Sequence, residues 1–366
     1  RARSQRHGSP RRPPPLAHVS RLTAPSELGL ANAPLRITTA ARYYSGDDTS
    51  DTSPLRGVTT LIVALVLVIA AFAAARSARA WWVARDVALR LPVGPSGIIE
   101  GAEPIVRERG GAREAVLLLH GFGDTPQTLT YLADELHARG WDVHAPLLPG
   151  HGRTLRSFAS SRSQQWVGAG REALDYLLAR YQRVALVGQS MGGALAAILA
   201  AERDRVVALA LLAPYVELPP RLRRLVRHHQ LIHVITPVLR GNSERSILDP
   251  AERMRSLGYR AMTPGLAREL SMVAERARMA LPRIRVPTLL AQSRQDNRLA
   301  SAVADRAFAA LGAKDKELLW LEGAGHVITV DYGREKLIDT VAEWIRRWAD
   351  AGGASPYESE TPTPPR

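Results

Sequence analysis

A serine in the middle of the chain stands where its hydroxyl could act as a nucleophile. Ser190 is the centre of Gly-Gln-Ser-Met-Gly-Gly at residues 188–193, which follows the apolar run 184–187 and precedes an alanine-rich helical stretch. A strand, a sharp turn and a helix form the context in which the pattern G-x-S-x-G presents a reactive serine. Gly188 and Gly192 fit this turn because the absence of a Cβ lets the strand and the helix approach.

The hydroxyl of a serine needs a base, and the base needs an acid that orients it. An expected strand at 286–291 leads into Asp296, and another at 318–321 leads into His326. The order serine, acid, histidine, each after a strand, therefore predicts Ser190 as nucleophile, Asp296 as acid and His326 as base. Two rival acids exist. Asp305 falls in an expected helix, and Asp331 is expected to cap or pair at the surface.

The tetrahedral intermediate of such a reaction carries an oxyanion, which backbone N–H groups stabilise. One donor is expected from the residue after the nucleophile, Met191. The other is expected from the loop after an earlier strand, where the run 115–119 is followed by His-Gly-Phe-Gly at 120–123. The sequence therefore predicts an oxyanion hole formed by Phe122 and Met191, and the ring of Phe122 could also line an acyl pocket.

Elements that could position these residues alternate between short apolar runs and helical patterns. The runs are continuously apolar, as strands buried on both faces of a parallel sheet require, and the predicted strands are 115–119, 143–145, 184–187, 206–212, 286–291 and 318–321. The predicted helices are 128–139, 164–181, 191–201, 300–311 and 334–348. We expect an α/β domain over residues 98–349, with a doubly wound, mostly parallel sheet whose functional residues lie at the carboxyl ends of the strands.

Several motifs together resemble the bacterial carboxylesterase and monoacylglycerol lipase family of α/β-hydrolases. They are LLLHGFGDTPQTL, LLPGHGR, Trp166 before a long helix, LVGQSMGGALA, SRQDN and GAGHVITVDYGRE, and the similarity covers about residues 112–348. The resemblance implies the α/β-hydrolase fold, nucleophile Ser190, acid Asp296, base His326 and the oxyanion amides of Phe122 and Met191. It also implies hydrolysis of carboxylic esters of short to medium acyl chains or of monoacylglycerols, with no metal and no organic cofactor.

Other functions remain compatible with the same residues. An acyltransferase or thioesterase would use an identical triad, and a membrane-tethered binding module could keep the fold without the chemistry. The net charge of +14 makes nucleic acid a partner to consider, but only three of the 49 basic residues are lysines and no recognition module is present, so we expect none. The chain has no cysteine, which excludes thiolate metal sites and cysteine nucleophiles. His229 and His233 have metal-ligand spacing, but Gln230 replaces the glutamate of a zinc protease motif, so we expect no metal.

The N-terminal part is predicted to attach the chain to a membrane. Residues 1–56 are rich in Arg and Pro and are expected to be a disordered leader. Residues 57–80 form an apolar segment in which 57–75 carry no charge and, as a helix, span roughly 28 Å, close to a hydrocarbon core. A single-pass anchor is expected. The alternatives are an exported protein cleaved after a signal peptide near Ala80, where Ala-Arg-Ala resembles a cleavage site, and a buried core helix.

An arginine-rich insertion, about residues 217–258, follows the expected strand 206–212 at the point where such folds carry a lid. Leucine, isoleucine and valine alternate there with Arg221, Arg223, Arg224 and Arg227. We expect a small amphipathic cap that covers an apolar acyl channel and contacts lipid headgroups, or a solvated basic helix with ordinary packing. Residues 352–366 are expected to be a flexible tail.

Overall fold

The computed structural model describes residues 53–241 and 245–351. The predicted tail 352–366 and nearly all of the predicted leader 1–56 lie outside the described residues. The chain divides into two units, 1–59 and 60–366, and the second contains all the predicted site residues.

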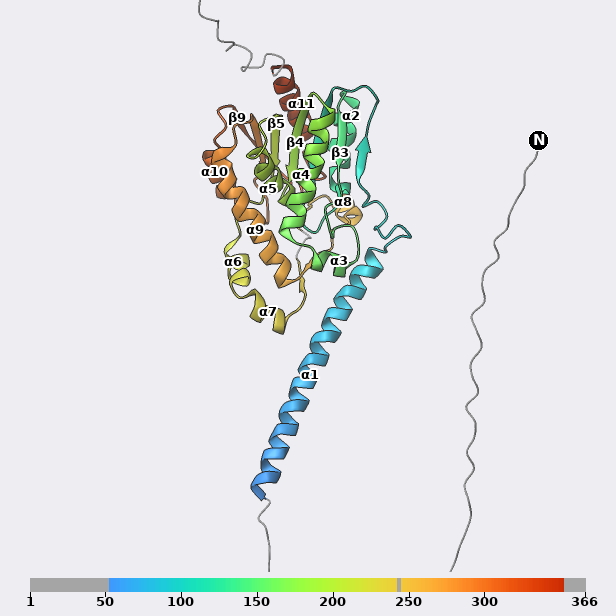
Figure 1. Ribbon diagram of the computed structural model, residues 1–366, viewed down its shortest axis with the longest axis vertical. Helices are drawn as coiled ribbons and strands as arrows, with labels where there is room; N and C mark the ends of the chain where they lie inside the picture. The colour runs from blue at the N-terminus through green and yellow to red at the C-terminus, as the bar shows by residue number, and fades with distance from the viewer. Residues whose placement is uncertain (1–52, 242–244, 352–366) are drawn as a thin grey trace, which may run out of the picture. The chain divides into compact units, whose positions relative to one another are not determined.

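A seven-stranded sheet forms the centre of the second unit, in the order β1-β3-β2-β4-β5-β8-β9 (Figure 1). Only β1 is antiparallel to its neighbour, so the doubly wound, mostly parallel sheet predicted from the sequence is confirmed. The strands are β1 (Ile105–Arg107), β2 (Glu114–Leu119), β3 (Asp142–Ala145), β4 (Arg183–Gln189), β5 (Val206–Leu212), β8 (Thr288–Ser293) and β9 (Lys316–Leu321).

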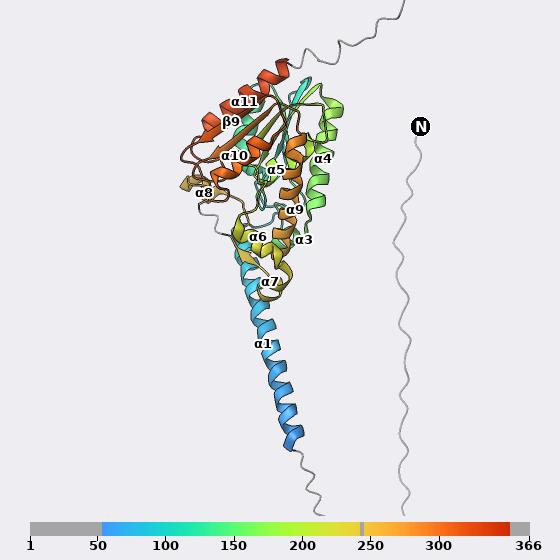
Figure 2. The same ribbon diagram turned by 90° about the vertical axis from the view of Figure 1, so that its left-hand side faces the viewer.

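Alternate residues of the central strands contribute to two separate cores. In β2, Leu117 and Leu119 belong to one apolar cluster and Val116 and Leu118 to the other, because successive side chains of a strand point to opposite faces. The first cluster includes residues of α4 (Ser163–Arg180), α5 (Met191–Ala200), α9 (Pro264–Ala280) and α10 (Ser301–Ala310), and the second those of α2 (Thr130–Ala138) and α11 (Arg334–Ala351). Figure 2 shows α4 and α9 on one side of the sheet and α11 on the other.

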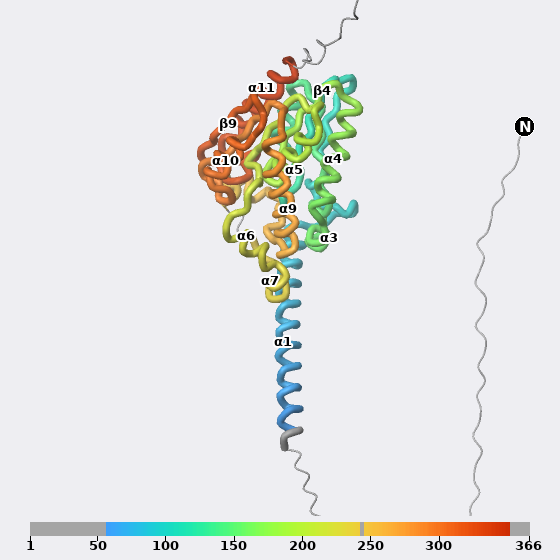
Figure 3. The backbone as a smooth tube through the Cα atoms, turned by 60° about the vertical axis from the view of Figure 1, so that its left-hand side comes forward, coloured from blue at the N-terminus to red at the C-terminus, as the bar shows by residue number. Residues whose placement is uncertain are grey.

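The insertion between β5 and β8 contains more structure than the sequence predicted. It comprises α6 (Pro220–Arg227), α7 (His229–Ile235), the hairpin of β6 (Leu239–Arg240) and β7 (Ala261–Met262), α8 (Pro250–Arg255) and α9. Both α6 and α7 contact α9 (Figure 3), and neither has a buried residue. Helix α9, which Leu266, Leu270 and Val273 give a buried face, was not predicted, because three arginines and two glutamates interrupt its apolar pattern.

Smaller elements complete the described chain. A 3-10 helix (Pro126–Leu129) precedes α2, α3 (Leu155–Ser160) precedes α4, and a second 3-10 helix (Leu281–Arg283) follows α9.

The apolar N-terminal segment is part of one long helix, α1 (Ser53–Arg90). The helix is long and apolar enough to cross a membrane, and none of its most apolar window is buried. Leu61 is 72% exposed and Leu67 63% exposed, so the alternative of a buried core helix is wrong for this stretch. Near the other end of α1, Val83 and Val87 join the first apolar cluster, which attaches the helix to the domain.

Candidate active site

Ser190 occupies the tight turn between β4 and α5. Its backbone has φ 56° and ψ −115°, a conformation that a residue with a side chain rarely adopts. A Cβ on Gly192 would lie 1.9 Å from the carbonyl oxygen of Leu119, and one on Gly188 would lie 2.1 Å from that of Gly192. Only glycine therefore fits at either position. The close approach of strand and helix that the motif predicts is therefore present in the backbone of the turn.

The side chains of Ser190, His326 and Asp296 form one hydrogen-bonded row. Ser190 Oγ lies 2.7 Å from Nε2 of His326, and Nδ1 of the same ring lies 2.7 Å from Oδ2 of Asp296. The three residues come from the ends of β4, β8 and β9, which are neighbours in the parallel sheet except for β5. Their meeting follows from the topology, since the carboxyl ends of parallel strands lie at the same edge.

Asp296 is held as an anion. Burial alone would raise the pKa of its carboxyl, but the facing His326 and the backbone N–H groups of Arg298 and Leu299 outweigh burial and lower that pKa. The two N–H groups donate to Oδ1 at 2.6 and 3.0 Å, and Gln292 donates to Oδ2. An anion there can fix the imidazole so that Nδ1 keeps its proton and Nε2 faces Ser190.

Phe122 and Met191, the predicted oxyanion residues, border Ser190 on two sides. Met191 is the first residue of α5, and Phe122 follows Gly121, where a Cβ would lie 3.5 Å from the Cβ of Ser190. The ring of Phe122 packs against Phe158 and Trp166 with centroids 5.0 and 5.9 Å away. The loop that contains Phe122 is thus fixed by an aromatic cluster.

Two neutral imidazoles lie beneath this loop. His120 is fully buried: its Nδ1 donates to the carbonyl of Gly121 and its Nε2 accepts from the backbone N–H of Leu148. Burial lowers the pKa of His120 to about 4. His151 packs against it in the aromatic cluster, and burial lowers its pKa well below the usual value. Both rings therefore support the loop at neutral pH without carrying charge.

Two residues that brace the histidine loop were not identified from the sequence. Gln189, the variable residue of the serine motif, donates from Nε2 to the carbonyl of His326 at 2.9 Å. Asp331 is completely buried, so the expectation that it caps or pairs at the surface is wrong. Its carboxylate accepts four backbone N–H groups, at distances of 2.7 to 3.0 Å, from Leu248, Asp249, Gly325 and Tyr332. Asp305, the other rival acid, is exposed on α10.

Asp124 is a further carboxyl group close to the row. Burial raises the pKa of Asp124 to about 7, although the backbone N–H of Thr125, the hydroxyl of Thr128 and the nearby His326 all oppose that rise. The backbone N–H of Thr125 donates to its carboxylate at 3.0 Å. A carboxyl that faces no fixed cation here keeps its proton up to near neutral pH.

Comparison with known proteins places this geometry in a family. The family model described as "Serine aminopeptidase, S33" matches residues 110–332, more than half of the chain. The chain belongs to this hydrolase family. The resemblance to esterases and lipases inferred from the motifs is confirmed by two relatives, the thermostable monoacylglycerol lipase of Bacillus sp. (strain H-257) and a carboxylesterase of Bacillus subtilis (strain 168). The first is 26% identical over 69% of this chain and 97% of the lipase, and the second 25% over 65% of this chain and 94% of the esterase.

The α/β-hydrolase fold is also confirmed by solved structures. A structure from a report on two metagenome-derived lipolytic enzymes, LipS and LipT, superposes with a TM-score of 0.63 at 28% identity, covering 68% of this chain and 99% of the other. A monoacylglycerol lipase from Paleococcus ferrophilus shares the fold with a TM-score of 0.58 at 23% identity, over 66% of this chain and 97% of the lipase. The family model begins at residue 110, after the end of α1, and therefore leaves that helix unmatched.

Proposed function

We propose that this S33 hydrolase cleaves carboxylic esters through an acyl-enzyme formed on Ser190. The observation that carries the proposal is the continuous row in which Ser190 Oγ and Oδ2 of Asp296 lie 2.7 Å from the two nitrogens of His326. A serine within hydrogen-bond reach of a base that an acid orients is the arrangement required for nucleophilic catalysis.

Each residue has one task in the proposed reaction. Nε2 of His326 takes the proton of Ser190 while Oγ attacks the ester carbonyl, and the N–H groups of Phe122 and Met191 receive the oxyanion. The protonated imidazole then gives its proton to the leaving alcohol, and Asp296 stabilises the charged ring. Water, activated by His326, releases the acid from Ser190. No metal or organic cofactor takes part.

The substrates proposed are esters of short to medium acyl chains and monoacylglycerols. Support comes from the relatives, which are named as a monoacylglycerol lipase and a carboxylesterase. The exposed apolar residues of α7, Leu231, Val234 and Ile235, also support this substrate class because they form an apolar patch over which an acyl chain can lie.

Replacing the nucleophile tests the proposal. Ser190→Ala should reduce turnover of p-nitrophenyl butyrate to background and abolish labelling by a fluorophosphonate, because both need Oγ. Ser160→Ala, which changes an exposed serine at the end of α3, is the matched control and should keep both activities. Activity that survives in a folded Ser190→Ala protein would contradict the assignment.

We also propose that residues 57–75 anchor the enzyme in a membrane. Their exposed apolar side chains support an anchor, and cleavage near Ala80 is the alternative. Arginine at Leu65 and Val68 should move the protein from the membrane to the soluble fraction, because each charge costs about 2.5–3.5 kcal/mol at a helix centre. The mass of the mature chain separates the alternatives, since cleavage removes everything before the cut.

A further inference from the structure

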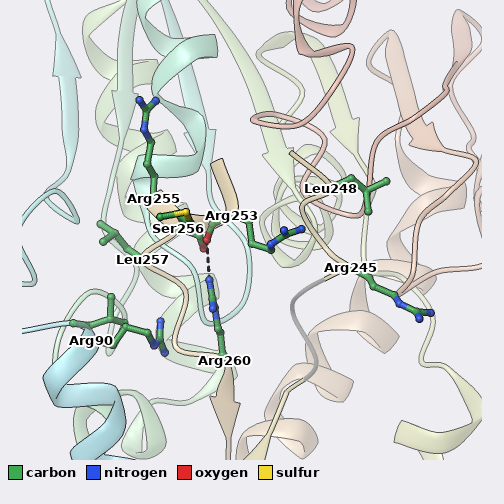
Figure 4. A pocket seen from close by; sticks show the side chains of 10 residues that line it. Arg90, Arg245, Leu248, Arg253, Arg255, Ser256, Leu257 and Arg260 are labelled. Atoms are coloured by element: carbon green, nitrogen blue, oxygen red, sulfur yellow. Dashed lines mark hydrogen bonds between the residues drawn. The ribbon is translucent and has the colours of Figure 1, made fainter. Parts of the chain in front are cut away.

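A cavity of about 680 Å³ outside the catalytic row is lined by five arginines and no acidic residue among those that the structure describes (Figure 4). The arginines come from the end of α1, from α8 and from the segments beside it: Arg90, Arg245, Arg253, Arg255 and Arg260. Leu91, Leu248 and Leu257 add apolar surface. We call this cavity the arginine pocket. Its size is within the range of small-molecule sites.

The positive charges of the arginine pocket are only partly satisfied by the protein. Arg90 donates to the carbonyls of Gly258 and Tyr259, and Arg260 to the carbonyl of Arg253, so these guanidinium groups are held by neutral acceptors. Nε of Arg260 is buried and has no hydrogen-bond partner among the described residues. Arg255 is paired with Glu252 at 3.4 Å.

Arg90 and Arg260 also repel each other. Burial and the charge of Arg260 both lower the pKa of Arg90, which Asp86 only partly offsets. An arginine does not lose its proton in a protein, so the repulsion remains unless an anion enters. Figure 4 shows Arg260 between Arg90 and Arg253. An anion bound beside Arg90 and Arg260 would therefore remove this repulsion.

Two segments beside the arginine pocket are hydrogen-bonded to the loops of the active site. The N–H of Tyr259 donates to the carbonyl of Gly123, the residue after Phe122, at 3.0 Å. On the other side, the carbonyl of Ser246, next to Arg245, accepts from Val327, the residue after His326, at 2.9 Å. Backbone hydrogen bonds thus connect segments at the edge of the pocket to both the oxyanion loop and the histidine loop.

The length of α1 argues against a phospholipid that stays in the bilayer. Ala75, the last residue of the apolar run, and Arg90 belong to the same helix, and the 15 steps from one to the other correspond to roughly 22 Å of rise. The phosphates of a membrane spanned by residues 57–75 would lie that far from the pocket. The ligand must leave the bilayer, as an amphiphile with a single acyl chain can.

From this we propose that the arginine pocket binds the phosphate of a single-chain acyl ester, so that acylglycerol phosphates are substrates. The inference rests on the proposed ester hydrolysis. Guanidinium groups match phosphate geometry and form charge-assisted hydrogen bonds with its oxygens. The bond between the acyl carbon and the glycerol oxygen breaks, water supplies the hydroxyl of the fatty acid, and glycerol phosphate leaves with the other proton.

Kinetics of the full-length enzyme test the proposal with 1-lauroylglycerol 3-phosphate and 1-lauroylglycerol as paired substrates. Arg260→Gln and Arg90→Gln should each lower kcat/KM for the phosphorylated ester about tenfold or more, since each removes a charged donor. Neither should change kcat/KM for 1-lauroylglycerol. Arg260→Lys should recover part of the loss. Arg221→Gln, on α6 outside the pocket, removes the same charge and should change neither value.

Equal losses on both substrates, or no loss on either, would overturn the proposal. Calorimetry on the Ser190→Ala protein keeps the test independent of catalysis. 1-Lauroylglycerol 3-phosphate should bind, and Arg260→Gln should weaken that binding. Inorganic phosphate that binds as tightly, or competition by vesicles of diacyl phosphatidylglycerol, would overturn the single-chain ligand. If the wild-type enzyme cleaves no ester at all but binding behaves as expected, the proposed function fails while the phosphate site stands.

Discussion

The catalytic row and the arginine pocket differ in how their charges are matched. Around Ser190, two acids are matched by donors: Asp296 faces His326 and two N–H groups, and Asp331 receives four N–H groups. Asp124, which faces no fixed cation, keeps a proton until its pKa of about 7. In the arginine pocket, five guanidinium groups gather with no acidic residue among the described lining residues.

The contrast lies in whether each region can neutralise its charges without a ligand. A carboxyl group with no partner can become neutral by binding a proton, whereas a guanidinium group cannot become neutral by losing one. The charges of the catalytic row are therefore neutralised without any ligand. In the arginine pocket, an anion would relieve the repulsion between Arg90 and Arg260.

Breaking the acid of the row should have the largest effect. Asp296→Asn leaves an amide that cannot fix the imidazole tautomer, and kcat for p-nitrophenyl butyrate should fall about 10⁴-fold, as it does when the acid of a serine protease triad is changed to the amide. Asp305→Asn on exposed α10 should change nothing. A residual rate near that of the wild type would mean that Asp296 does not orient His326.

The next effect tests the turn that presents Ser190. A Cβ at position 192 would meet the backbone of Leu119 and His120, which cannot move aside, so Gly192→Ala should lower the free energy of unfolding by about 4–5 kcal/mol or prevent folding. A Cβ at Gly168, in α4, meets nothing, and Gly168→Ala should stabilise by about 0.5–1 kcal/mol. Thermal and urea denaturation measure both. Similar values for the two variants would refute the steric account.

A smaller effect is expected from the buried carboxylate behind the histidine loop. In Asp331→Asn an amide NH₂ replaces a carboxylate oxygen, so backbone N–H groups that donated to that oxygen lose their acceptor. The free energy of unfolding, measured by urea denaturation, should fall by about 3 kcal/mol, and kcat should fall as well. Asp134→Asn removes an exposed partner of Arg107 and should cost less than about 1 kcal/mol. Equal losses of stability in the two variants would show that the buried carboxylate of Asp331 contributes no more than an exposed one.

The smallest effect concerns Asp124 and depends on pH. The folded-state pKa of about 7 lies above the unfolded value, so the fold disfavours the ionised form and wild-type stability falls as pH rises from about 4 to 7. The free energy of unfolding of Asp124→Asn should not have this dependence on pH. Above pH 7 it should be more stable than the wild type by about 2 kcal/mol, because loss of the bond from Thr125 offsets part of the gain. Denaturation at pH 4, 5.5, 7 and 8.5 measures the difference, and parallel profiles would contradict it.

Much of the candidate site could be predicted because its residues carry local signals. Gly188 and Gly192 are required by a turn within one short segment, and Asp296 and His326 each follow an apolar strand. Gln189 and Asp331 carry no such signal. A glutamine inside the serine motif and an aspartate after the histidine acquire their roles only from backbone groups that are distant in the chain, 137 residues away for Gln189 and 83 for one partner of Asp331.

The strands were predicted more accurately than the insertion for a similar reason. The predicted run 206–212 coincides with β5, and the predicted run 115–119 differs from β2 by one residue, because strands buried on both faces are apolar throughout. Helix α9 was missed. Half of its surface faces solvent, and its arginines interrupt the apolar residues along the sequence, so the apolar face is hard to recognise.

The sequence by itself determined the buried strands of the parallel sheet, the reactive serine turn and the apolar length of α1, since each depends on neighbours along the chain. Only the tertiary structure decided that Asp331 is buried and that five arginines from separate segments share one cavity. Charges interact through space, and the fold alone decides which of them meet.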